Sequence, residues 1–98
     1  MNDPVTLLAA LAEPTRLAAL RILWDGSEHC VCELMSKLDA SQSRMSRHMA
    51  ALKAAGLVSD RRDAQWVRYR MRADLPDQVA ALVGAALALP AAEKRVAA

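Results

Sequence analysis

Val31-Cys-Glu-Leu-Met-Ser-Lys-Leu38 and Gln42-Ser-Arg-Met-Ser-Arg-His-Met-Ala-Ala-Leu-Lys-Ala-Ala55 stand in the middle of the chain, separated only by Asp39-Ala-Ser41. In both segments apolar residues recur at three- and four-residue steps, which is the spacing of one face of an α-helix. Ser41 is a favourable N-cap for the second helix, and Gly56 is a favourable stop after it. Two helices joined by so short a turn indicate a helix-turn-helix.

Helices are also predicted on both sides of this motif. Residues 4–11 and about 14–24 have helical spacing, and Pro14 suits a first helical turn. The last predicted helix, about residues 76–89, is apolar on nearly all sides and needs cover on more than one side. Because a 98-residue chain rich in alanine and without phenylalanine buries a modest core, we predict that a second copy supplies this cover. The residues expected on the buried face of the second helix are Leu17, Leu20, Leu23 and Trp24.

The apolar spacing changes to a period of two after the helix-turn-helix. Residues 57–61 and 66–71 therefore predict two antiparallel strands, joined through Arg62-Asp-Ala-Gln65. The second strand alternates apolar residues with arginines, so one face is expected to be buried and the other cationic. A basic hairpin directly after a helix-turn-helix is a wing. The predicted fold class is a mainly α winged helix-turn-helix with a small β-hairpin.

Positive charge is concentrated in one part of the chain. The formal net charge of the whole sequence is only +2. Residues 41–72 contain eight basic and two acidic residues, about +6, whereas residues 1–40 contain three basic and six acidic residues, about −3. Residues 73–98 contain two basic and three acidic residues, about −1. A basic block of this kind is expected for a protein that binds the phosphate backbone of DNA.

Cys30 and Cys32 are the chain's only cysteines, and they precede or begin the first helix of the helix-turn-helix. Residues two apart in a regular helix point about 200° away from each other, so two thiolates at this spacing cannot easily share one ion. The start of this helix must therefore be non-helical, or must unwind when the ion binds. Because this helix supports the recognition helix, either arrangement would couple ion capture to DNA binding. Thiolates favour soft ions, and a helix N-terminus lowers the pKa of a cysteine.

The sequence also predicts where the protein acts. It has no secretory signal and no apolar run long enough to span a membrane, so we expect a soluble cytoplasmic protein without a membrane partner. In that reducing compartment a cysteine pair is expected to be a ligand or a redox element rather than a structural disulfide.

Four stretches carry a resemblance to a known family. They are Leu11-Ala-Glu-Pro-Thr-Arg-Leu-Ala-Ala-Leu20, Cys30-Val-Cys-Glu-Leu34, Ser41-Gln-Ser-Arg-Met-Ser-Arg-His-Met-Ala-Ala-Leu-Lys-Ala-Ala-Gly-Leu57 and Trp66-Val-Arg-Tyr-Arg70. In this order and over roughly residues 5–72, they resemble the ArsR/SmtB family of bacterial metal-responsive repressors. The stretch that holds both cysteines resembles the arsenic-sensing branch of that family.

The resemblance implies a single winged helix-turn-helix domain that binds double-stranded operator DNA as a homodimer. It implies repression of a metalloid-resistance operon, relieved when arsenite or antimonite, As(III) or Sb(III), binds Cys30 and Cys32. No organic cofactor is implied. The expected ranges within the domain of residues 1–98 are dimerisation by about 4–11 and 76–89, the helix-turn-helix at about 31–55 and the wing at about 57–72.

The third ligand of the ion stays open in the sequence. As(III) takes three sulfur ligands in a pyramidal arrangement, and the arsenic-sensing pattern commonly has a third cysteine where this chain has Met35. Met35 is expected to pack in the core, because a thioether is a weak ligand and Met35 shares a stripe with Val31 and Leu38. His29, next to Cys30, is the other protein candidate. An exogenous thiol or water is the alternative to both.

The residues expected to contact DNA lie on the recognition helix and the wing. Glutamine and arginine side chains can read adenine and guanine edges in the major groove, and the N-terminal part of a recognition helix lies nearest the bases. Arg16 and Arg21 are expected to be structural instead, paired with nearby acids. The residues expected nearest the bases are Gln42, Ser43 and Arg47, and Ser46 is a further outward residue of the same helix. The expected phosphate contacts are Arg44, His48 and Lys53. The expected contacts from the wing are Arg61, Arg62, Gln65 and Arg68.

Three other functions are compatible with the same cysteines. The repressor could sense a soft divalent ion such as Cd²⁺, Pb²⁺ or Zn²⁺, although the final helix holds no histidine and only Asp77 as an acid, which weakens a zinc site there. The trigger could instead be thiol oxidation. The third, a thiol–disulfide exchange enzyme, is disfavoured because no strand–helix scaffold of the thioredoxin type surrounds the pair and no acid–base set accompanies it.

Overall fold

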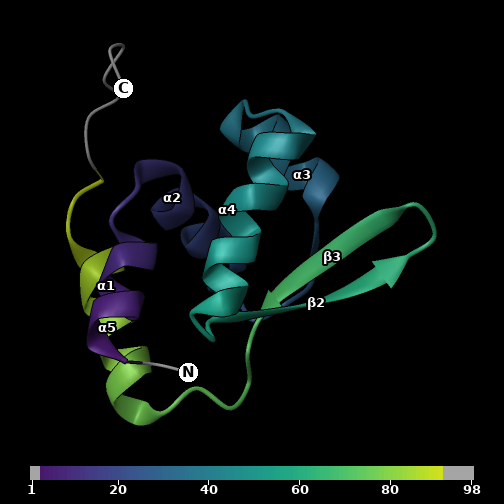
Figure 1. Ribbon diagram of the computed structural model, residues 1–98. Helices are drawn as coiled ribbons and strands as arrows, with labels where there is room; N and C mark the ends of the chain where they lie inside the picture. The colour runs from purple at the N-terminus through teal and green to yellow at the C-terminus, as the bar shows by residue number, and fades with distance from the viewer. Residues whose placement is uncertain (1–2, 92–98) are drawn as a thin grey trace.

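Five helices and three short strands make up the part of the chain that the computed structural model describes, residues 3–91 (Figure 1). This arrangement confirms the winged helix-turn-helix. Every predicted helix is present, with boundaries within one residue of the prediction. The elements are α1 (Pro4–Leu11), α2 (Pro14–Leu23), β1 (His29–Cys30), α3 (Val31–Leu38), α4 (Gln42–Ala54), β2 (Val58–Asp63), β3 (Trp66–Met71) and α5 (Asp77–Ala88).

Local sequence explains where the helices begin and end. The side chains of Asp3, Glu13 and Ser41 each accept a hydrogen bond from the backbone N–H three residues later, which caps α1, α2 and α4. After α4 the chain turns at Gly56, whose φ of +82° is readily available only to glycine. The tight turn between α3 and α4 uses Asp39 in the left-handed conformation, with φ of 53°.

The strands form one antiparallel sheet in the order β1-β3-β2. The β2–β3 pairing runs from Val58 opposite Met71 to Asp63 opposite Trp66. The predicted end of the first wing strand at residue 61 is therefore wrong, because the pairing continues for two more residues and leaves only a two-residue turn. Strand β1 was not predicted, since two residues are too few to show an alternating pattern.

The core lies between the helix-turn-helix, α2 and the base of the wing. Its fully buried side chains come from all these elements, and each large one contributes about 1.5–3 kcal/mol through burial. The largest are Leu20, Leu23, Leu34, Met45, Met49, Leu52 and Leu57. This packing places the recognition helix α4 against α2 and α3 and leaves its opposite face accessible (Figure 1).

Helices α1 and α5 lie on the same side of the molecule, away from the wing (Figure 1). Each buries one narrow stripe on the common core: Leu7, Ala10 and Leu11 from α1, and Val79 and Val83 from α5. Most of their remaining apolar residues are exposed, although Leu87 of α5 is partly buried and packs against the core. Between residues 3 and 91, none of the helices combines the length and apolarity needed to cross a bilayer.

Trp24 is not on the buried stripe of α2 that the sequence predicted. It is the C-cap residue of α2 and is 41% exposed. Its ring lies over Gly84 of α5, where a Cβ atom would stand 3.5 Å from it. The helical spacing ends one residue before Trp24, so its side chain leaves the core and contacts α5 instead.

Candidate functional site

Cys30 and Cys32 meet because only one of them lies inside a helix. Cys30 is the extended N-cap residue of α3, with φ of −67° and ψ of 144°, and Cys32 is the second helical residue. Their Cα atoms are 5.1 Å apart and their sulfur atoms form a disulfide. Of the two alternatives that the spacing left open, the non-helical start is therefore confirmed, and no unwinding of α3 is needed to bring the sulfurs together.

The two cysteines differ in their access to solvent. Cys30 is 7% exposed and belongs to the hydrophobic core cluster, whereas Cys32 is exposed. The backbone N–H of Cys32 donates to Cys30 Sγ at 3.2 Å, so a sulfur takes the capping role usually filled by a serine or aspartate oxygen.

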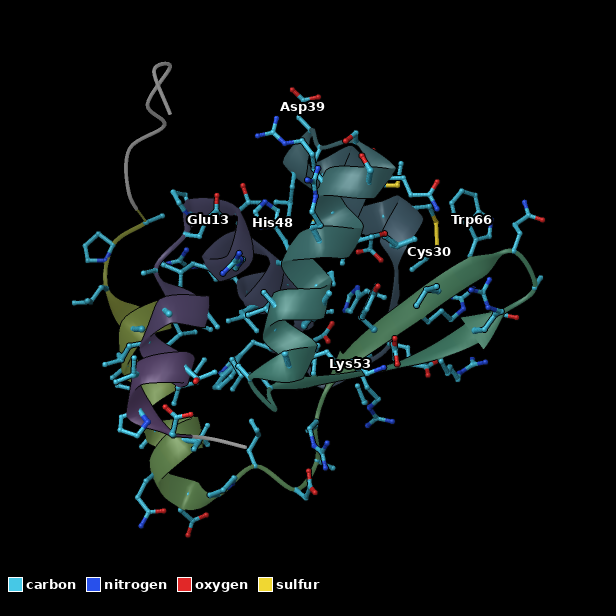
Figure 2. All side chains as sticks on the ribbon, viewed as in Figure 1. Glu13, Cys30, Asp39, His48, Lys53 and Trp66 are labelled. Atoms are coloured by element: carbon cyan, nitrogen blue, oxygen red, sulfur yellow. A yellow bond between two sulfur atoms is a disulfide. The ribbon has the colours of Figure 1, made fainter. Side chains whose placement is uncertain are left out.

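Cys30 also belongs to the wing sheet. It pairs with Arg68 of β3, and the preceding His29 pairs with Tyr69. In Figure 2 Cys30 lies between α3 and the wing. The cysteine site is thus connected to two elements at once, to α3 through its N-cap and to the wing through β3. The sequence indicated only the first connection.

His29 is held between two acidic side chains. Its Nδ1 lies 2.9 Å from Glu33 Oε1, and its Nε2 lies 3.0 Å from Asp25 and 3.1 Å from Ser27 Oγ. Burial opposes a charge on the ring, but the hydrogen bonds to Asp25 and Glu33 outweigh it and raise the pKa of His29. Because both ring nitrogens are engaged, His29 would have to release a carboxylate before it could bind an ion.

This arrangement predicts a pH-dependent contribution to stability. Protonated His29 is stabilised in the folded state, so the contribution is full below the unfolded pKa of about 6.5 and disappears as pH rises through the raised folded value. His29→Gln should lower the free energy of unfolding by up to about 1 kcal/mol near pH 5, and by much less near pH 9. Urea titrations at both pH values measure this; an equal loss at both would contradict a role for the charged ring.

Met35 is partly buried and packs against the core, as predicted for a packing residue. Its thioether sulfur forms no hydrogen bond within residues 3–91, whereas its carbonyl oxygen accepts one from the Ala40 N–H at 3.1 Å. It therefore offers no support for a third protein ligand.

The exposed face of α4 is largely free of internal contacts. Gln42, Arg44 and Arg47 are exposed and form no side-chain hydrogen bond or ion pair within residues 3–91. Ser43 Oγ lies 3.4 Å from Ser41 Oγ, and Ser46 is exposed. The structure thus gathers on one accessible helix face the residues that the sequence placed nearest the bases.

His48 and Lys53 are positioned differently from the rest of that set. His48 is partly buried, and its Nδ1 lies 3.2 Å from Arg16 Nε and 4.0 Å from Glu13 Oε1. Figure 2 shows His48 beside Glu13 on one flank of α4, with Lys53 near the opposite end of that helix. Lys53 Nζ forms an ion pair with Asp60 of β2 at 2.9 Å. Both side chains therefore have partners within the protein, which the sequence did not indicate.

Acidic residues neutralise much of the wing. Arg61 forms two hydrogen bonds with Glu28, at 2.7 and 2.8 Å, and Arg68 donates to Asp63 at 2.6 Å. The hydrogen bond from Arg61 lowers the pKa of Glu28, which keeps that acid ionised. Arg62 is exposed and forms no ion pair in the described part of the chain. Of the predicted wing contacts, Arg62 and Gln65 are therefore the two that are exposed and not held by an acid in the described part of the chain.

One pocket of about 270 Å³ lies beside the recognition helix. It is lined by Arg16, Arg44, Arg47 and His48. Arg16, expected to be structural, thus joins two arginines that were expected to contact DNA.

Sequence comparison identifies proteins similar to this chain. Residues 13–60 match the family model described as bacterial regulatory protein, arsR family. The arsenical resistance operon repressor of Escherichia coli (strain K12) is 40% identical over 80 residues, which are 82% of this chain and 68% of that protein. The arsenic resistance transcriptional regulator ArsR2 of Pseudomonas putida is 42% identical over 79 residues, 81% of this chain and 69% of that protein.

Solved structures give the same result for the fold. Reduced HlyU from Vibrio cholerae is 41% identical, with a TM-score of 0.70 over 83% of this chain and 81% of that one. The homodimeric winged helix-turn-helix domain Mb0332 from Mycobacterium bovis, described as a possible ArsR-family regulator, is 28% identical. Its TM-score is 0.69, over 84% of this chain and 72% of that one.

Proposed function

This chain belongs to the arsR family of bacterial regulatory proteins, which are DNA-binding transcription regulators rather than enzymes, and from that premise we propose that it represses an operator until arsenite or antimonite binds Cys30 and Cys32. The observation that carries the proposal is the meeting of two sulfur atoms at the N-terminus of α3, the helix packed on the recognition helix. Reduced, these sulfurs form a pair of soft ligands already placed side by side. The names of the similar repressors support a metalloid as the ion.

The donor set fits a trivalent metalloid better than a closed divalent site. Within residues 3–91, no group of three or more histidine, cysteine or acidic side chains is arranged to hold a metal ion. A structural zinc site needs four ligands. Arsenous acid can condense with the two thiols, forming two As–S bonds and releasing two waters. The third position then keeps a hydroxyl group or exchanges it for a small exogenous thiol.

Ion binding has two routes to the DNA-binding surface. Cys30 caps α3, which packs on α4, and Cys30 pairs with β3 of the wing. A ligand shifts a protein between two conformations only by its differential affinity for them. We propose that the S–As–S bridge favours a position of β1 and the α3 N-terminus that misaligns α4 and the wing on DNA.

The test is release of operator DNA by ions. The reduced protein, bound to an operator duplex selected from random sequence, is titrated with arsenite, antimonite, cadmium, lead and zinc. Arsenite and antimonite should release the DNA at the lowest concentrations. Release by zinc or cadmium alone would identify a divalent ion, and not the metalloid, as the inducer. The absence of any DNA binding would contradict the proposal that the protein is a repressor.

Thiol oxidation is the second candidate trigger, favoured by the disulfide between Cys30 and Cys32. Disulfide formation removes both thiolates and links the N-cap of α3 to its first turn. Comparing operator affinity in dithiothreitol and after peroxide separates the two triggers. If oxidation alone releases the DNA and arsenite has no effect, redox sensing is the function of the pair.

We propose that the protein acts as a homodimer through α1 and α5. Val5 and Leu8 of α1, at 76% and 52% exposed, and Leu82 and Leu89 in and after α5, at 39% and 66%, leave an apolar surface on one side of the molecule. The similar Mb0332 domain is homodimeric. A dimer that binds operator DNA is expected in the cytoplasm, where the DNA lies.

Leu82→Glu should therefore disrupt the dimer. An uncompensated buried charge costs about 3–5 kcal/mol, which is roughly a hundredfold or more in the dissociation constant. Sedimentation at micromolar concentration should show a dimer for the wild type and a monomer for Leu82→Glu, with circular dichroism reporting any unfolding. Ser36→Glu, on the exposed side of α3, is the control and should stay dimeric. A monomeric wild type would contradict the proposal.

A further inference from the structure

Three arginines and a histidine meet in the pocket of about 270 Å³ between α2 and the recognition helix. Arg16 comes from α2, and Arg44, Arg47 and His48 come from α4. Neither Arg44 nor Arg47 has an acidic partner in the described residues. Guanidinium groups that outnumber the acids beside them repel one another, so a concave site lined by them attracts an anion.

Arg16 is held in place by three polar contacts. Its Nε donates to His48 Nδ1 at 3.2 Å, its Nη1 donates to the Ala10 carbonyl at 3.4 Å, and its backbone N–H donates to Glu13 Oε1 at 2.9 Å. Nδ1 of His48 serves as the acceptor of the hydrogen bond from Arg16 Nε–H. His48 therefore orients the Arg16 guanidinium.

The Glu13 carboxylate is the acid beside this cluster. One of its oxygens lies 4.0 Å from His48 Nδ1, and the same oxygen caps α2 through the Arg16 backbone N–H. One carboxylate against three guanidinium groups leaves an excess positive charge at the pocket.

We propose that this pocket seats one phosphate of the DNA backbone, with Arg16 and Arg44 as its donors and His48 as a positioning residue. The inference rests on the proposed DNA-binding function and adds to it a contact from α2, outside the helix-turn-helix and the wing. The planar guanidinium fork matches two phosphate oxygens at once. Phosphate contacts beside a recognition helix determine how that helix is oriented in the groove. Arg47 lies one turn further along α4 and is left for the base contact predicted from the sequence.

The test is the salt dependence of DNA binding by the full-length reduced chain, measured by fluorescence anisotropy on an operator duplex and on an unrelated duplex. Each phosphate contact contributes about 0.9 to the slope of log affinity against log salt. Arg16→Gln should lower the magnitude of that slope by about two for a dimer with two pockets. It should weaken binding to both duplexes equally. Arg21→Gln is the matched control, since Arg21 is on the same helix and donates to the Leu89 carbonyl.

Variants of His48 test its positioning role. His48→Asn keeps an acceptor oxygen near the position of Nδ1 and should retain the wild-type slope. His48→Leu removes the acceptor and should lose part of the slope. Equal behaviour of the two variants would remove His48 from the proposal. If Arg16→Gln does not fold, Arg44→Gln carries the same test, because Arg44 is exposed and supports no internal contact.

An unchanged slope in Arg16→Gln or Arg44→Gln, with the wild type still binding DNA, overturns the phosphate site and leaves the repressor intact. No DNA binding by the wild type overturns the proposed function instead. Inorganic phosphate is compared with chloride at equal ionic strength to test for a free anion. Protection of the wild type against heat by phosphate, lost in Arg16→Gln while the DNA slope is unchanged, would assign the pocket to free phosphate and overturn the DNA contact.

Discussion

Cys30→Ser and Cys32→Ser should each bind operator DNA as the wild type does and should stay bound when arsenite is added. Serine is a favourable N-cap, so Cys30→Ser can keep the capping hydrogen bond of α3, and Cys32 is exposed. Neither substitution removes a large apolar side chain from the core. One remaining thiolate cannot form the S–As–S bridge, so the arsenite concentration for half release should rise on the order of a hundredfold, near the upper range of typical allosteric coupling.

Met35→Leu is the matched control for the cysteine variants. It preserves the volume of a partly buried core residue and removes the thioether at the position of the third candidate ligand, so both stability and the arsenite response should be close to wild type. Operator release followed by fluorescence anisotropy in the presence of a reductant measures all three variants. Loss of the response in Met35→Leu would make the thioether a ligand. Full response in both cysteine variants would place the sensor site elsewhere in the protein.

Operator affinity should fall about a thousandfold between 50 and 200 mM salt, the lower end of the range for six to ten phosphate contacts. The lower end is expected because many cations of the basic block are already paired within the protein. These pairs are Lys53 with Asp60, Arg61 with Glu28, Arg68 with Asp63 and Arg72 with Asp74. A salt dependence that approaches zero would contradict binding through the phosphate backbone.

Arg47→Ala should weaken binding to the operator more than binding to unrelated DNA. Arg47 is exposed on the recognition helix and has no internal partner in residues 3–91, so it is free to reach a base edge. A bidentate arginine–guanine contact discriminates by about 1–3 kcal/mol. Arg72→Gln is the control for lost charge, because Arg72 is paired with Asp74 after the wing. Equal weakening on both duplexes would reduce Arg47 to a phosphate contact.

The sequence was sufficient to predict the structural elements whose deciding interactions are local. Helix periodicity, caps and the period of two in the wing act over a few residues, and these patterns correctly predicted all five helices and the hairpin. The spacing of Cys30 and Cys32 also restricted how they could meet, because helix geometry is the same in every protein. The spacing did not decide whether the start of α3 is non-helical or unwinds on binding. The extended backbone at Cys30 shows that the start is non-helical.

The pairing of charged side chains came only from the tertiary structure. Arg61 pairs with Glu28 across 33 residues, and Arg16 bonds His48 across 32. A charged residue in a sequence shows its sign but not its partner, so neither the Arg61–Glu28 ion pair nor the hydrogen bond from Arg16 to His48, in place of an acid, was predicted. Strand β1 also depends on a long-range contact, in this case between backbone groups. Its two residues form a strand only because β3 lies beside them. Long-range contacts of this kind depend on how the whole chain packs, which no local pattern records.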